Sequence, residues 1–177
     1  MKAFFVHPKM LFKKKMFTPV GELTLVASNI GVHAVLFEGH NGSWSSLSAS
    51  KESKTHPILL QCEKELTEYF NGKRSHFSIP LELSGTEFQK KVWSVLEKIP
   101  YGKTISYSEQ AKMMGRKKSA RAVAAANGQN PVAIIIPCHR VIALTGYLHG
   151  YAGGLHLKQK LLELEGIKIK NLQVLKS

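Results

Sequence analysis

The pattern of apolar residues changes after Leu83, and this change limits the possible folds more than any other feature of the chain. Before it, the short apolar runs Leu23–Ala27 and Val32–Phe37 are separated by a turn signal and predict a β-hairpin. After it, residues that start helices precede apolar residues at helical spacing. The sequence therefore predicts an α+β protein, with a small β-rich domain over 1–83 and a mostly helical domain over 84–177.

The rest of the first part is consistent with one small core. Apolar residues recur at helical spacing over 56–70 and predict a helix that ends at Asn71-Gly72. Cys62 lies on that apolar stripe, so we expect it to pack in the core. The Ser- and Gly-rich stretch Gly39–Ser53 predicts an exposed loop, and the Lys13–Lys15 cluster a solvated surface.

Two capping boxes mark helices in the second part. Thr86 with Gln89, and Ser106 with Glu109, have the spacing that satisfies free N–H groups at the start of a helix. The second of these helices is expected to close at Gly115. The remaining expected elements are a helix capped by Ser119 that runs to Gly128, a strand over Val132–Ile136, and a helix over Leu155–Glu165 with Gly166 at its stop position.

The charge of the second part indicates a polyanionic partner. The formal net charge of the chain is +13. From Ser84 on there are 15 basic residues against 5 acidic ones, compared with 10 against 7 up to Leu83. Such an excess favours nucleic acid as the partner. A basic surface that serves solubility is the alternative.

Other features of the sequence exclude several kinds of site. The chain has no aspartate, so catalytic triads and metal sites built on Asp are excluded. Its two cysteines provide neither a disulfide framework nor a CxxC zinc motif, and no apolar run approaches the ~20 residues of a membrane span. Met1–Val6 is followed by His7-Pro8, which makes a poor signal peptide. A reduced, cytoplasmic compartment is therefore expected.

Two short helices joined by the basic turn Arg116–Lys118 indicate a helix-turn-helix. The second helix, over 119–127, consists mostly of small residues, whereas a major-groove reader needs several long polar side chains. Arg121 is its one long basic side chain. The helix therefore suits close approach to the minor groove, with Arg121 entering the base stack as in proteins that extrude a base. The alternative is that the alanines simply form a helix that packs against a neighbour.

The strongest candidate for a reactive residue is Cys138, which follows the apolar run Ile134–Ile136 and Pro137. His139 and Arg140 come directly after it, and two cationic neighbours would favour the thiolate and therefore nucleophilic reactivity. The alternative is a buried cysteine that ends a core strand.

Cys138 and its neighbours resemble the active-site signature of the O6-alkylguanine-DNA alkyltransferases (methylated-DNA–protein-cysteine methyltransferases), bacterial type. The similarity is nearly continuous from Thr86 to Gly166. Thr18–Leu23 also looks like the first strand of that family's N-terminal domain, which is ribonuclease-H-like. The matching stretches are Phe88-Gln89-x-x-Val92-Trp93, Ile99-Pro100-Tyr101-Gly102, Ile105-Ser106-Tyr107, Ala120-Arg121-Ala122-Val123, Asn127-x-x-Asn130-Pro131, Pro137-Cys138-His139-Arg140-Val141, Gly153-Gly154-Leu155 and Leu161-Leu162-x-x-Glu165-Gly166.

The resemblance implies catalytic roles for five residues. Cys138 corresponds to the nucleophile and alkyl acceptor, His139 to a base that acts through a bound water, and Glu165 to the carboxylate that orients His139. Neighbouring residues on an extended segment point to opposite faces, which suits a water relay between the thiol and the imidazole. Tyr107 corresponds to the donor of a proton toward the guanine ring, and Asn130 to the hinge between the recognition helix and the active-site strand.

The resemblance also implies contacts with DNA and with the alkylated base. Arg121 corresponds to the residue that fills the base stack after the nucleotide turns out. Ala152 stands where some relatives carry a serine that contacts the substrate oxygen. The expected DNA-binding residues are Tyr107, Lys118, Ser119, Ala120, Arg121 and Ala122. The expected alkyl and base pocket consists of Tyr107, Pro137, Val141, Tyr151, Ala152 and Lys158.

The implied function is the repair of O6-alkylguanine in double-stranded DNA, with O4-alkylthymine as a further candidate substrate. The alkyl group would pass once and irreversibly to Cys138, without cofactor or metal, and a monomer is expected. DNA affinity would depend on salt through phosphate contacts. The alternatives are a damage sensor that transfers nothing, a helix-turn-helix regulator, and a Cys–His hydrolase. The presence of Cys138 argues against the first, and the alanine-rich helix against the second.

Overall fold

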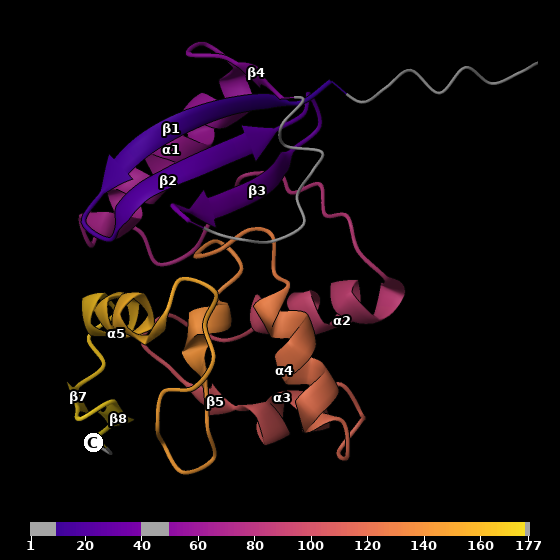
Figure 1. The fold of residues 1–177 in the computed structure, drawn as a ribbon, viewed down its shortest axis with the longest axis vertical. Helices are drawn as coiled ribbons and strands as arrows, with labels where there is room; N and C mark the ends of the chain where they lie inside the picture. Colours follow the sequence, from indigo (N-terminus) through magenta and orange to yellow (C-terminus); the bar gives the residue numbers. More distant parts are fainter. Residues whose placement is uncertain (1–9, 40–49, 176–177) are drawn as a thin grey trace, which may run out of the picture.

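The structure is a computed structural model that describes residues 10–39 and 50–175. A sheet with a helix on one face forms one end of the molecule, and a group of helices forms the other (Figure 1). The order of a β-rich part followed by a helical part confirms the predicted α+β class. No helix within the described ranges is long and apolar enough to cross a membrane. The expectations for Met1–Val6 and for positions 40–49 of the loop lie outside the described residues.

The N-terminal sheet has the strand order β3-β2-β1-β4. Neighbouring strands are antiparallel except β1 and β4, which are parallel. The helix α1 (Pro57–Phe70) packs on one face, and Cys62 is fully buried there, as expected. The strands are β1 (Phe12–Thr18), β2 (Gly21–Ala27), β3 (Val32–Phe37) and β4 (Lys51–Glu52).

The start of the sheet differs from the prediction. The chain turns between β1 and β2, inside the segment Thr18–Leu23 that was expected to be the first strand, and the Thr18 hydroxyl donates to the Gly21 carbonyl at 2.6 Å. The lysine cluster belongs to β1, where Lys14 forms an ion pair with Glu63 of α1 at 2.6 Å. Three successive lysines hide the alternation that marks a strand. The short strand β4 also lies within the stretch predicted to be a loop.

The second part contains the helices that the capping boxes predicted. Thr86 caps α2 with Gln89, and Ser106 caps α3 with Glu109, each through both reciprocal hydrogen bonds. Ser119 precedes the next helix but makes no side-chain capping bond, which corrects that expectation. The elements are α2 (Glu87–Leu96), β5 (Ile105–Ser106), α3 (Tyr107–Met113), α4 (Ala120–Gly128), β6 (Val141–Ile142), α5 (Leu155–Leu164), β7 (Ile169–Lys170) and β8 (Gln173–Val174).

The segment Val132–Ile136, expected to be a strand, is a buried turn. Val35 of β3 donates its N–H to the Pro131 carbonyl at 2.9 Å and accepts from the Ala133 N–H at 3.2 Å. The chain then reverses at Ile134, whose φ of 73° is left-handed. A buried segment needs apolar side chains whether its backbone forms a strand or a turn. The apolar run alone could therefore not distinguish the two. These bonds fix the segment before Cys138 to the edge of the N-terminal sheet.

Candidate active site

Cys138 begins one turn of 3-10 helix, Cys138–Arg140, which replaces the extended segment expected here. The turn is closed by the Arg140 N–H, which donates to the Pro137 carbonyl at 3.0 Å. Cys138 is only half-buried, whereas the side chains of His139 and Arg140 point into the protein interior. The helical turn, and not strand alternation, therefore separates the thiol from the imidazole.

Asn130 connects the end of α4 to the thiol. Its Nδ2 donates to Cys138 Sγ at 3.2 Å and to the Ile136 carbonyl at 2.8 Å. Its Oδ1 accepts from the Val132 N–H at 3.0 Å. The amide therefore holds both ends of the buried turn and directs an N–H at the sulfur, where it can stabilise a thiolate.

The thiol lacks the cationic neighbours that the sequence suggested. His139 and Arg140 are both directed at Glu165 and not at the sulfur. Burial raises the pKa of the Cys138 thiol, and the Asn130 hydrogen bond and the charge of Lys158 only partly oppose this. The expectation of a thiolate activated by two adjacent cations is therefore wrong. Cys138 is a protonated thiol at neutral pH and needs a base.

His139 has the features of that base. Its ring is fully buried, and Nε2 lies 2.8 Å from Glu165 Oε1. Because an ionised carboxylate only accepts, Nε2 carries the proton and Nδ1 carries the lone pair. Nδ1 is buried and makes no hydrogen bond to any described residue. Burial lowers the pKa of His139, and Glu165 only partly restores it, so the resting imidazole is neutral and can accept a proton.

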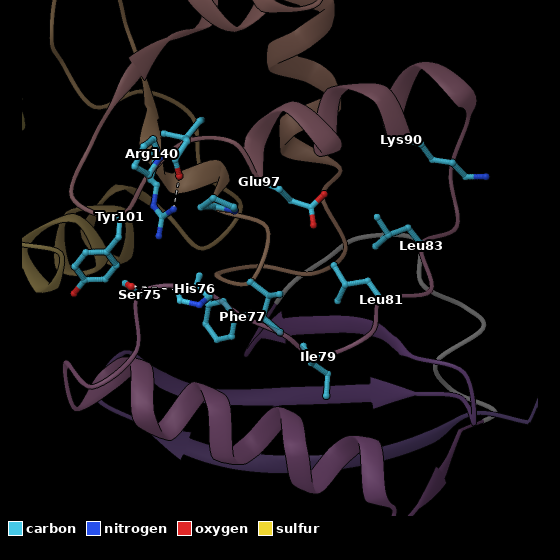
Figure 2. A pocket seen from close by; sticks show the side chains of 14 residues that line it. Ser75, His76, Phe77, Ile79, Leu81, Leu83, Lys90, Glu97, Tyr101 and Arg140 are labelled. Carbon is cyan, nitrogen blue, oxygen red and sulfur yellow. Dashed lines mark hydrogen bonds between the residues drawn. The ribbon is translucent and has the colours of Figure 1, made fainter.

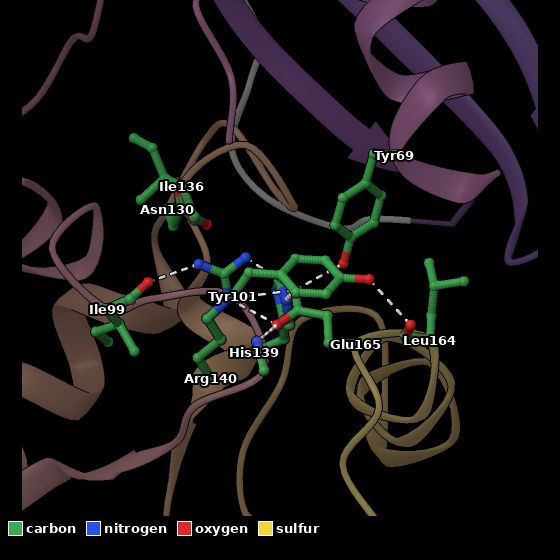
Figure 3. A network of polar contacts seen from close by, with 10 residues as sticks. Tyr69, Ile99, Tyr101, Asn130, Ile136, His139, Arg140, Leu164 and Glu165 are labelled. Carbon is green, nitrogen blue, oxygen red and sulfur yellow. Dashed lines mark hydrogen bonds and ion pairs between the residues drawn. The ribbon is translucent and has the colours of Figure 1, made fainter. Parts of the chain in front are cut away.

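Glu165, at the C-cap of α5, is the centre of the polar network in Figure 3. Although burial favours its neutral form, hydrogen bonds from His139 and Arg140 and the charge of Arg140 lower its pKa to about 2. The carboxylate is therefore ionised throughout the physiological range. The donors to Oε1 are Tyr69 Oη at 2.8 Å, His139 Nε2 at 2.8 Å and Arg140 Nη2 at 2.9 Å, and the donors to Oε2 are Arg140 Nε at 2.9 Å and the Gly102 N–H at 3.1 Å.

Tyr69 is a member of this network that the sequence analysis missed. It lies in the last turn of α1, on the apolar stripe of that helix, and it is fully buried. A fully buried tyrosine needs a partner for its hydroxyl, and this was the only local signal. The partner, Glu165, is 96 residues away in the sequence. The N-terminal part of the chain therefore reaches the polar centre of the C-terminal part.

Tyr107 and Lys158 hold one loop from two sides. Tyr107, the first residue of α3, donates its hydroxyl to the His149 carbonyl at 3.0 Å. Lys158, fully buried on α5, donates to the same carbonyl at 2.7 Å and to the Val141 carbonyl at 2.6 Å. Burial raises the pKa of Tyr107 to about 12 and lowers that of Lys158 to about 8, so Tyr107 keeps its proton at neutral pH.

The thiol opens on a small cavity that both parts of the chain line. Tyr151 and Ala152 lie beside Cys138 there, and Phe37 of β3 packs edge-on against the Tyr151 ring. A larger cavity of about 680 Å³ lies between residues 75–83 and α2 and does not include the thiol (Figure 2). Of the expected pocket residues, the small cavity thus includes Tyr151 and Ala152. Pro137 lines the larger one, whereas Val141 and Lys158 are fully buried, and Tyr107 lines neither.

The second helix of the helix-turn-helix presents small residues outward. Arg121 and Ala122 are exposed, while Val123 and Ala126 are buried, and the Trp93 indole donates to the Ala126 carbonyl at 2.8 Å. One side of α4 thus packs on α2. On that side the alternative stated above is correct, because the small residues pack against a neighbouring helix. Of the other expected DNA contacts, Lys118 is exposed, and Ser119, Ala120 and Tyr107 are half-buried.

Comparison with known families assigns this architecture. Residues 87–167 match the family described as 6-O-methylguanine DNA methyltransferase, DNA binding domain, and residues 11–83 match 6-O-methylguanine DNA methyltransferase, ribonuclease-like domain. The chain belongs to the 6-O-methylguanine DNA methyltransferase family. The ribonuclease-like first domain and the resemblance seen in the sequence are thereby confirmed.

Relatives of this methyltransferase family align over most of their length. The chain is 42% identical to the methylated-DNA–protein-cysteine methyltransferase of Methanosarcina acetivorans, over 84% of this chain and 94% of the relative. It is 40% identical to the constitutive one of Bacillus subtilis, over 86% and 94%. Mycobacterium tuberculosis O6-methylguanine methyltransferase superposes with a TM-score of 0.81 at 39% identity, over 88% and 93%. Mycobacterium tuberculosis OGT in complex with DNA gives 0.80 at 38%, over 87% and 92%.

In this methyltransferase family member, the neighbouring residues Cys138 and His139 belong to two separate hydrogen bonds. Asn130 donates to the Cys138 thiol, and His139 donates to Glu165. Arg121 belongs to a separate, exposed helix face. Across residues 10–39 and 50–175, no three His, Cys or Glu side chains are grouped so that they could hold a metal ion. The arrangement supplies a thiol, an amide donor and a buried base, which is the equipment for nucleophilic attack.

Proposed function

We propose that this protein repairs O6-alkylguanine in double-stranded DNA by transferring the alkyl group to its own Cys138. The observation that carries the proposal is geometric: the Asn130 amide is directed at the Cys138 sulfur, and Glu165 orients the buried imidazole of the next residue, His139. The names of the relatives, methylated-DNA–protein-cysteine methyltransferases, support the same chemistry.

In the proposed mechanism His139 removes the thiol proton through a water molecule bound at Nδ1. The resulting imidazolium is stabilised by Glu165, and the thiolate by the Asn130 N–H. The sulfur then attacks the alkyl carbon, so that an S–C bond forms as the C–O6 bond breaks and the bonding electrons pass to the guanine. The thioether is stable, and each protein molecule therefore reacts once. O4-alkylthymine presents the same kind of alkyl–oxygen bond and is a second candidate substrate.

The departing guanine accepts a proton, for which Tyr107 is the proposed donor. Its hydroxyl keeps its proton at neutral pH because burial raises its pKa to about 12. The proton is directed at the His149 carbonyl, which lies on the loop before Tyr151 and Ala152. We propose that an extruded base takes the place of this carbonyl as the acceptor, while Lys158 keeps the loop anchored.

Access to the buried lesion is proposed to occur through α4. The exposed face formed by Arg121 and Ala122 lets the helix backbone approach the minor groove, and Arg121 enters the stack in place of the extruded nucleotide. The helix carries few long side chains for reading bases, so binding is proposed to be independent of sequence and dependent on salt. One copy of the chain contains every proposed group, and we therefore propose that it acts as a monomer. The proposed location is the cytoplasm, the reduced compartment that the sequence leads us to expect.

The decisive experiment is incubation with duplex DNA that contains O6-methylguanine. Peptide mass spectrometry should find one added methyl group on the peptide that holds Cys138, and its amount should rise to one per protein and then stop. A sensor or a transcription regulator would leave the peptide unmodified, and a Cys–His hydrolase would turn over repeatedly on an acyl substrate.

Replacement of Tyr107 by phenylalanine is expected to slow methyl transfer by about a hundredfold, since it removes the proton donor and general acids contribute at least that much. DNA affinity should change little, because the ring stays on α3. Single-turnover transfer rates and binding titrations on the same duplex measure the two effects. Equal losses in rate and affinity would remove Tyr107 from the mechanism.

Replacement of Arg121 by alanine is expected to slow transfer from duplex DNA by about ten- to a hundredfold, because extruding a base costs a few kcal/mol and the arginine offsets part of it. The same lesion in a single strand needs no extrusion and serves as the control substrate. Transfer from the single strand should be nearly unchanged. If both substrates slowed alike, Arg121 would act through general affinity and not through base extrusion.

A further inference from the structure

The larger cavity, the lysines of β1 and the hairpin of β7 and β8 show no group that identifies a ligand or partner. The buried network around Glu165 contains a group to which the proposed chemistry assigns no role. Tyr69 contributes a hydroxyl to this network from the N-terminal domain (Figure 3).

Tyr69 is held firmly in place. It is fully buried at the end of α1, and its ring packs against Tyr101 and Phe77 at centroid distances of 6.1 Å and 5.6 Å. The hydroxyl has one proton, and at 2.8 Å that proton is donated to Glu165 Oε1. Burial and the nearby carboxylate raise the pKa of Tyr69 well above its usual value, so the donor stays protonated over the whole working range.

Oε1 is also the oxygen that accepts from His139. The two donors therefore compete for the charge of one atom. Each hydrogen bond donated to a carboxylate takes up part of its negative charge and leaves less for the other donors. Arg140 contacts both oxygens and keeps the carboxylate ionised whether or not Tyr69 donates.

We propose that Tyr69 is a positioning residue for alkyl transfer: through Oε1 it fixes the orientation of Glu165 and limits how strongly the carboxylate attracts a proton to His139. The proposal rests on the proposed function, in which His139 must be neutral before it accepts the thiol proton. The N-terminal domain thereby takes part in the chemistry of the C-terminal domain through one hydrogen bond.

The direction of the effect follows from the groups that surround the pair. Without the Tyr69 hydroxyl, more of the Glu165 charge acts on the imidazole, so the pKa of His139 rises and the ring is protonated up to a higher pH. The other titratable groups that face His139 or Glu165 are unchanged by this substitution; they are Arg140, Lys158, Cys138, Tyr101 and Tyr151.

The test is a pH titration of the His139 ring nitrogens by NMR in the full chain, with the resonances assigned by their loss in His139→Gln. In Tyr69→Phe the midpoint should move to higher pH by about 0.5 to 1 unit. Tyr101→Phe is the matched control: it removes a neighbouring hydroxyl that donates to the Leu164 carbonyl and not to the carboxylate. The melting temperature of Tyr101→Phe should fall by about as much as that of Tyr69→Phe, but the midpoint of the His139 titration should not change.

A second readout is the pH dependence of the single-turnover transfer rate, whose acidic limb should shift in the same direction and by the same amount. An unchanged midpoint in Tyr69→Phe, or equal shifts in both tyrosine variants, would overturn the proposal. The NMR result does not depend on transfer, so failure of the proposed function would be seen separately. If Tyr69→Phe does not fold, the NMR signal of the Tyr69 hydroxyl proton in the unmodified protein provides the test. Its chemical shift should change with pH at the midpoint of the His139 titration. A chemical shift that does not follow this titration would overturn the proposal.

Discussion

Replacing Cys138 by alanine is expected to abolish methyl transfer from duplex DNA while leaving DNA binding intact. In the proposed mechanism Sγ forms the new bond to the alkyl carbon, and no other described group at this position can replace it. The side chain is half-buried at the start of a 3-10 turn and its removal leaves the Glu165 network untouched, so the fold should persist. Mass spectrometry measures the methyl group, and a binding titration measures the affinity.

The matched control is Cys62→Ala. This second thiol is fully buried on α1, and burial raises its pKa to about 12, which makes it inert. Its loss should lower the free energy of unfolding by about 1 to 2 kcal/mol and leave one methyl group transferred per protein. Transfer that persists in Cys138→Ala, or that disappears in Cys62→Ala, would contradict the assignment of the nucleophile.

The features that the sequence predicted correctly are those with local causes. Each capping box is complete within four residues, so Thr86 and Ser106 fixed the starts of α2 and α3 without tertiary information. The turn at Val132–Ile136 was predicted wrongly because its backbone is determined from outside, by hydrogen bonds to Val35 across the domain boundary. Apolar residues were required there in either conformation.

In the candidate site, too, the sequence indicated local features but not contacts between distant parts of the chain. The run from Pro137 to Arg140 singles out Cys138 as the candidate nucleophile, but sequence adjacency could not say where the neighbouring cations point. In the structure Glu165 attracts both of them, and the thiol receives an amide hydrogen bond from Asn130 instead. Tyr69 was missed for a related reason: its contact spans 96 residues, and a tyrosine on an apolar stripe looks like ordinary core.

Replacing Glu165 by glutamine is expected to give the largest loss of stability among the variants considered, together with a large loss of transfer. Arg140 is almost fully buried, and breaking a buried ion pair from one side costs about 3 to 5 kcal/mol because the remaining charge is left without compensation. The imidazolium would also lose its counter-charge, so transfer should slow by about a hundredfold or more. Denaturant unfolding and single-turnover rates measure the two effects. The control is Glu163→Gln on the same helix. This side chain is exposed, its carboxylate accepts from Gln159, and the variant should stay within about 0.5 kcal/mol of the unmodified protein.

The pH dependence separates this charge effect from a packing effect. Folding lowers the pKa of Glu165 to about 2, so its contribution to stability is complete above its unfolded pKa and is lost as the pH falls through the folded one. The difference in unfolding free energy between the unmodified protein and Glu165→Gln should therefore be full at about pH 6. It should shrink as the pH falls from about 5 toward 2. A packing defect would leave the difference constant with pH. A constant difference would therefore show that the shape of Glu165, and not its charge, makes it necessary. It would contradict the proposal that the charge of Glu165 stabilises the protonated form of His139.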